Sequence, residues 1–141
     1  MASKRELLHG ELTDRIIRTF FEVHYELGPG FLEAIYARAM AIVLADLGMR
    51  VQREVPLTVH FRGRQIGFFR ADMVVEGLIL VEFKAGKALD PTWEAQLINN
   101  LSAIRLEVGL SLFFGTKPVV KRKIFTNDRK LLAPDVLSET P

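Results

Sequence analysis

Residues 78–84 read LILVEFK, a run of four apolar residues that closes with Glu82, Phe83 and Lys84. Such a run predicts a strand buried inside a sheet, and its last residues break the pattern with two opposite charges. A buried charge costs several kcal/mol unless it is paired or binds a metal. The end of this strand is therefore the first candidate for a functional site.

The elements predicted around this strand form a mixed sheet flanked by helices. Apolar residues recur at helical spacing over about 11–27 and again over about 31–47, with Gly28-Pro29-Gly30 between the two helices. The period then changes to two, and strands are predicted at 51–61, 65–74, 78–84, 108–114 and 119–125. Asp90-Pro91 opens a helix that runs to about residue 104. A helix between two strands of one sheet is a crossover that makes them parallel, so the fold class is α/β or α+β with a mixed central sheet.

Length and composition indicate one cytoplasmic domain, 1–141. It comprises a helical hairpin at about 11–48, a sheet with its crossover helix at about 51–125, and a loosely held tail at 127–141. The chain has no cysteine, which excludes disulfides, thiolate metal sites and a cysteine nucleophile. No stretch has the apolar length of a signal peptide or a membrane span, so no membrane contact is expected.

Basic residues gather in two places although the net charge is only +2. They are candidates for contacts with nucleic acid: Arg62, Arg64, Arg70, Lys121, Arg122 and Lys123. Lysines and arginines also protect the solvated edges of sheets. Both interpretations, a phosphate-binding surface and two ordinary strand edges, remain open at this point.

Asp72 is a second acid within a largely apolar run, 68–75. A three-residue hairpin loop at 75–77 would set Asp72 opposite Leu80 and Arg70 opposite Glu82, and would bring Asp72, Glu82 and Lys84 to one face with the two acids as diagonal neighbours. A two-residue turn at Glu76-Gly77 would instead put Asp72 opposite Val81, on the other face. Two carboxylates so close repel unless a cation lies between them, and oxygen ligands of this type suit Mg²⁺ or Mn²⁺. The alternative is a salt bridge of Asp72 or Glu82 with Lys84 or Arg70.

The chain also carries motifs of a known family. Gly30 to Tyr36 has the form GxxExxY, and 14–125 resembles the GxxExxY protein family of the PD-(D/E)XK nuclease superfamily. Asp72 with Val81-Glu82-Phe83-Lys84 resembles the core motif of that superfamily, although Ala71 stands where its proline is usual. The resemblance implies a restriction-endonuclease-like core and a magnesium-dependent phosphodiesterase site. It implies Glu33, Asp72, Glu82, Lys84 and Gln96 as the catalytic set.

Roles for these residues follow from the resemblance. Asp72 and Glu82 would hold Mg²⁺ or Mn²⁺, with the backbone carbonyl of Phe83 and the Glu33 carboxylate as further ligands. Lys84 would orient or deprotonate the attacking water, and Gln96 would hold that water or a phosphate oxygen. Gly30 and Tyr36 are supporting residues.

Each role has a structural alternative. Glu33 can simply complement the dipole of its helix, and Gln96 can be an ordinary solvated position. Tyr36 is expected to pack and to hydrogen-bond Glu33, while Trp93 and Phe68-Phe69 are expected in the core rather than as base-stacking platforms.

Two function classes result. The first is a metal-dependent nuclease acting on nucleic acid, with DNA favoured over RNA. The second is a non-catalytic module that binds nucleic acid or a partner on the same fold. A homodimer is favoured, since a chain of 141 residues has little surface with which to grip a duplex.

Overall fold

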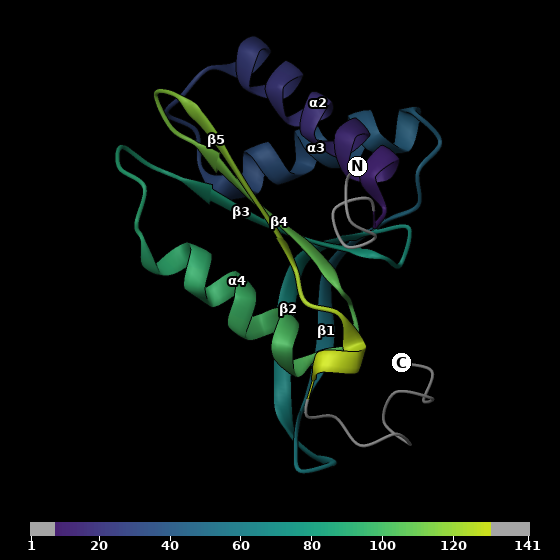
Figure 1. Ribbon diagram of the computed structural model, residues 1–141. Helices are drawn as coiled ribbons and strands as arrows, with labels where there is room; N and C mark the ends of the chain where they lie inside the picture. The colour runs from purple at the N-terminus through teal and green to yellow at the C-terminus, as the bar shows by residue number, and fades with distance from the viewer. Residues whose placement is uncertain (1–7, 131–141) are drawn as a thin grey trace, which may run out of the picture.

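The computed structural model describes residues 8–130, which form a five-stranded sheet covered by helices on both faces (Figure 1). In chain order the elements are α2 (Gly10–Leu27), α3 (Glu33–Asp46), β1 (Val51–Phe61), β2 (Arg64–Val75), β3 (Ile79–Ala85), α4 (Thr92–Ala103), β4 (Val108–Phe114), β5 (Pro118–Ile124) and the short 3₁₀ helix η1 (Asn127–Arg129). These bounds lie within a few residues of those predicted from periodicity.

The sheet is mixed, as predicted. Its strands follow the order β1-β2-β3-β4-β5, and only β3 and β4 run parallel, because α4 carries the chain back between them. The three helices with the mixed sheet make an α+β fold of the restriction-endonuclease-like type. The prediction of fold class is confirmed.

Each face of the sheet has its own core. Alternate residues of β3, Ile79, Val81 and Phe83, pack beneath α2 and α3. The residue between the first two, Leu80, packs against Leu97 and Leu101 of α4. Since side chains alternate along a strand, Glu82 and Lys84 point to the α4 face while Phe83 anchors the opposite face.

The α2–α3 hairpin covers one face and presents the start of α3 to the sheet. In the part of the chain that the structure describes, no helix has the length and apolar character needed to cross a membrane.

The start of the predicted tail is bonded to the rest of the protein. Asn127 donates its N–H to the Glu107 carboxylate at 2.8 Å, and the buried Lys130 ammonium donates to the carbonyls of Ile104 and Leu106, each at 2.8 Å. The remainder of that tail, 131–141, lies outside the described residues.

Candidate active site

The β2–β3 hairpin has a different register from the predicted one. Glu76 and Gly77 both adopt left-handed backbone, with φ 56° and 65°, and the Leu78 N–H closes the turn on the Val75 carbonyl at 3.0 Å. Leu78 is then left unpaired, and the ladder starts with Val75 opposite Ile79. The predicted pairing of Asp72 with Leu80 and Arg70 with Glu82 is wrong, because the three-residue loop spans 76–78 rather than 75–77.

The ladder between β2 and β3 ends where the acids lie. Its last pair is Met73 with Val81, and one further step would set Asp72 directly opposite Glu82. Instead, the Asp72 carboxylate accepts the Phe83 N–H at 2.8 Å, a contact that replaces the next rung of the ladder. The two carboxylates therefore share a face, as predicted, but as direct neighbours rather than diagonal ones.

The same step is irregular on the other side of β2. Val51 and Met73 pack in the core beneath α2 and α3, whereas Val55 and Ala71 pack toward α4, so the alternation of both strands changes phase between them. Glu54 lies at that step, has a left-handed φ of 51° and makes no ladder pair with Asp72. A left-handed non-glycine residue costs on the order of 1 kcal/mol. Beyond this step, Leu57 and Phe69 of the β1–β2 hairpin also pack toward α4.

Polar residues continue from Glu82 across the sheet. Glu82 pairs with Ser111 of β4, and Ser111 pairs with Lys121 of β5, so all three lie in one row on the α4 face. Ser111 is buried within a strand that is otherwise apolar. This row was not predicted, because pairing partners across a parallel crossover cannot be read from spacing along the chain.

A cleft of about 230 Å³ opens between this row, the first turn of α3 and one side of α4. The five residues of the predicted catalytic set all line it: Glu33, Asp72, Glu82, Lys84 and Gln96. Its other walls include Arg70, Trp93, Asn100 and Ser111. The structure thus brings together side chains from α3, β2, β3 and α4.

Glu82 is the most strongly perturbed group of the cleft. Burial, and then the neighbouring negative charge of Asp72, raise its pKa from an ordinary value of 4.5 to about 9, although Lys84 opposes the shift. One carboxyl oxygen, Oε1, is buried without a hydrogen-bond partner. A carboxyl group this short of partners is the kind of ligand that a cation would satisfy.

Lys84 is held by an aromatic ring rather than by an acid. Its Nζ lies 5.5 Å from the ring centroid of Trp93, whose ring in turn packs on Phe113 at 5.5 Å. Among residues 8–130, no ion pair within 4.0 Å includes Asp72, Glu82 or Lys84. The salt-bridge alternative for these acids is therefore not what the structure contains.

Tyr36 organises the loop that precedes Glu33. It is fully buried, as expected, and its ring stacks on Phe114 with centroids 4.0 Å apart. Its hydroxyl donates to the Gly28 carbonyl and accepts the Phe31 N–H at 3.2 Å, so the predicted bond to Glu33 is wrong. Between these anchors Gly30 has φ 110°, a conformation that favours glycine. The GxxExxY pattern thus fixes the loop and, through it, the first turn of α3.

The basic residues divide between two faces and one hairpin end. Lys121 and Lys123 both approach the Glu94 carboxylate of α4, Lys121 at 4.0 Å and Lys123 more closely. Arg122 lies on the opposite face, where it donates to the Leu8 carbonyl at 2.7 Å and to Thr13 Oγ1 at 3.3 Å. Sequence spacing groups these three residues, but strand alternation separates Arg122 from its neighbours.

The arginines of the β1–β2 hairpin remain at the surface. Arg62 lies in its turn, 5.2 Å from the Phe61 ring, and Arg64 directly follows the turn. Arg70 reaches Glu54 only at 4.0 Å, with both side chains about two-thirds exposed. An exposed contact of that length contributes little to stability. In the Phe68-Phe69 pair, Phe69 packs in the core and Phe68 is exposed, so the expectation of two core residues is half met.

The donor set suits a small, hard divalent cation. Asp72 and Glu82 offer adjacent carboxylate oxygens, and Oε1 of Glu82 has no other partner. Within residues 8–130 no group of three or more His, Cys, Asp or Glu side chains is arranged to enclose a metal. Mg²⁺ is commonly bound by one or two carboxylates together with water and substrate phosphate, so two acids fit it.

Comparison with family models shows which superfamily the chain belongs to. The model of the PD-(D/E)XK nuclease superfamily matches residues 10–124, which include every element from α2 to β5. Searches of curated proteins and of solved structures found no match to the chain.

Proposed function

We propose that this chain, which belongs to the PD-(D/E)XK nuclease superfamily, hydrolyses phosphodiester bonds of nucleic acid with the help of a divalent metal ion. One observation carries the proposal. Asp72, Glu82 and Lys84 meet in one cleft at the point where the β2–β3 ladder opens, and Glu33 and Gln96 line the same cleft. Nucleases of this superfamily generally use divalent metals.

Asp72 and Glu82 would hold Mg²⁺ or Mn²⁺, with the Phe83 carbonyl and Glu33 as candidates for further ligands. The bound ion would lower the pKa of a coordinated water and neutralise charge that develops on the phosphate. Asp72 is oriented for this task by the Phe83 N–H, which its carboxylate accepts at 2.8 Å. Glu82 has to lose its proton before it can act as a ligand, because burial raises its pKa to about 9.

Lys84 and Gln96 serve the reacting groups directly. The Lys84 ammonium, held over Trp93, would stabilise the negative charge of the transition state and orient the attacking water. Gln96 lines the same cleft from α4 and can donate its amide N–H to a phosphate oxygen. Ser111, next to Glu82 in the row across the sheet, adds a hydroxyl that can donate to the Glu82 carboxylate once it is ionised.

The exposed arginines of the β1–β2 hairpin give the substrate a route to the cleft. Arg70 lines the cleft itself, and Arg62 and Arg64 continue from it along the same hairpin. Arginines that follow the hairpin away from the cleft can neutralise successive phosphates of a bound strand, which strengthens binding. DNA is the favoured substrate, and the GxxExxY family is the favoured subgroup. Two copies of the chain would supply a larger surface for contacts with nucleic acid.

Metal binding is the direct test. Mg²⁺ or Mn²⁺ titrated into the protein by calorimetry should bind in a saturable manner near millimolar concentration, and Asp72→Asn should remove that binding. Glu94→Gln is the matched control, since Glu94 is an acid of the same face that lies outside the cleft. Absence of saturable binding, or equal binding by Asp72→Asn, would favour the non-catalytic module instead.

A further inference from the structure

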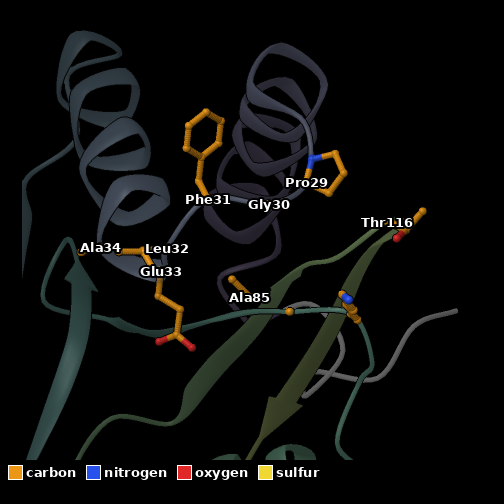
Figure 2. Close-up of a pocket in the computed structure, with 10 residues that line it drawn as sticks. Pro29, Gly30, Phe31, Leu32, Glu33, Ala34, Ala85 and Thr116 are labelled. Atoms are coloured by element: carbon orange, nitrogen blue, oxygen red, sulfur yellow. The ribbon is translucent and has the colours of Figure 1, made fainter.

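A second and larger pocket adjoins the catalytic cleft. It has a volume of about 750 Å³ and lies between the α2–α3 loop, the end of β3 and the β4–β5 turn. Figure 2 shows its walls, with Phe31 and Glu33 leaving the backbone in opposite directions. Glu33 lines both this pocket and the cleft, so the two spaces meet at that side chain.

The walls of this pocket are fixed by hydrogen bonds. Tyr36 holds the α2–α3 loop at Gly28 and Phe31, and His24 bonds the Gly115 carbonyl at 2.7 Å next to the β4–β5 turn. A pocket whose loops are tied in this way exists before a ligand arrives, which lowers the entropic cost of binding. The volume is within the range of about 300–1,000 Å³ that small organic groups occupy in proteins.

The chemistry of the walls is apolar with a few polar groups. Pro29, Leu32 and Ala85 supply apolar surface, and Lys87 and Thr116 supply a cation and a hydroxyl. Leu32 is 75% exposed, so a ligand in the pocket can contact this apolar side chain. A group with apolar faces, polar edges and a neighbouring negative charge matches these walls, and a nucleobase on its phosphate has that composition.

We propose that this pocket receives an unstacked base of the substrate strand, adjacent to the phosphate held in the cleft, and that the substrate is therefore single-stranded at the site. This inference rests on the proposed nuclease function. Lys84 faces the cleft and Lys87 lines the pocket, and three residues of extended chain span at most about 10 Å, which one nucleotide can bridge. A base paired within a duplex stays stacked and shows only its groove edges, so it could not enter.

The test measures binding with calcium in place of magnesium, so that affinity is read without cleavage. A labelled single-stranded oligonucleotide carries one abasic site, moved along the strand, in a DNA and an RNA series. Wild type should lose about tenfold in affinity when the abasic site falls at one position, and should bind the intact single strand more tightly than its duplex. A loss in either series supports the pocket, and the series that shows it identifies the sugar.

Leu32→Ser is the informative variant and Ile42→Ser its matched control. Both side chains are exposed, at 75% and 63%, but only Leu32 lines the pocket. Leu32→Ser should weaken single-strand binding by about tenfold. Its affinity should then be the same wherever the abasic site falls, since the variant has already lost the contact between the pocket and the base. Ile42→Ser should behave as wild type.

The outcomes separate the pocket from the nuclease. The proposal of a base-binding pocket is overturned if the affinity of wild type does not depend on the position of the abasic site, if duplex binds equally well, or if Leu32→Ser binds as wild type does. Metal-dependent cleavage of duplex by the same protein would in that case still support the nuclease function. A position-specific loss in a protein that cleaves no strand supports the pocket and overturns the nuclease.

Discussion

Replacing Glu82 by glutamine should stabilise the metal-free protein. Burial and the charge of Asp72 raise the pKa of Glu82 to about 9, so the folded chain holds a proton there at pH 7 that the unfolded chain releases. Glutamine has nearly the same shape as the protonated acid and does not titrate. In the variant a neutral side chain of the same shape occupies the site, so folding no longer requires the uptake of a proton at pH 7.

The size of the effect follows from linkage. An acid whose folded pKa lies above its ordinary value of 4.5 makes the protein less stable as pH rises from there to about 9. Each pH unit in that interval is worth at most about 1.4 kcal/mol, so pH 7 gives an upper limit of about 3.5 kcal/mol. Because the cleft admits water, we expect Glu82→Gln to gain about 1–3 kcal/mol at pH 7.

The assay is chemical denaturation in chelator at several pH values. The difference between Glu82→Gln and wild type should be near zero at pH 4.5 and should grow steadily to pH 8.5. Glu22→Gln, at an exposed position on α2, is the control and should show no such growth. A Glu82→Gln variant that is less stable than wild type, or a difference that does not change with pH, would mean that Glu82 is ionised and paired, and would refute the reasoning.

Three further changes test other contacts. Tyr36→Phe removes the hydroxyl that holds the α2–α3 loop and should lower the unfolding free energy by about 1–3 kcal/mol. The rate of cleavage should fall by a larger factor than the affinity for nucleic acid, and equal losses would contradict a positioning role. Arg122→Gln should destabilise the protein by about 1–2 kcal/mol and leave the salt dependence of nucleic-acid binding unchanged, because Arg122 bonds to the Leu8 carbonyl and Thr13 on the opposite face. Lys121→Gln should reduce the log–log slope of that dependence by about 0.7 on single strands or about 0.9 on duplex DNA. Lys130→Met leaves the carbonyls of Ile104 and Leu106 without their donor and should lower the unfolding free energy by about 1–3 kcal/mol. An unchanged midpoint of thermal or chemical unfolding would show that water replaces the ammonium.

Periodicity was sufficient for the elements and the sheet. The change from a helical to a two-residue period after Gly48, and the crossover helix that starts after Asp90, predict a mixed sheet with β3 and β4 parallel, as the structure has it. The LILVEFK run occupies a central strand with Glu82 and Lys84 on one face. These features depend on local pattern, which a single sequence contains.

The exact geometry of the site depends on features that local pattern does not contain. The position of the hairpin loop, which leaves Leu78 unpaired, and the left-handed Glu54 decide which side chains meet, and neither residue is a glycine or proline that would indicate an irregularity. Ser111 and Trp93 reach the cleft through pairing and packing between segments far apart in the chain. Arg122 was grouped with its neighbours because charge was counted along the sequence rather than by face.

Asp72 and Glu82 are proposed here as the metal-binding site of a nuclease. The measurement that tests this proposal most directly is the rate of cleavage of labelled single-stranded and duplex DNA and RNA in chelator and in excess Mg²⁺ or Mn²⁺, for wild type, Asp72→Asn and the control Glu94→Gln. We expect cleavage by wild type and Glu94→Gln only with metal, and a loss of at least about a hundredfold in Asp72→Asn. Cleavage that persists in chelator or in Asp72→Asn, or folded wild type that cleaves none of these substrates with metal, would contradict it.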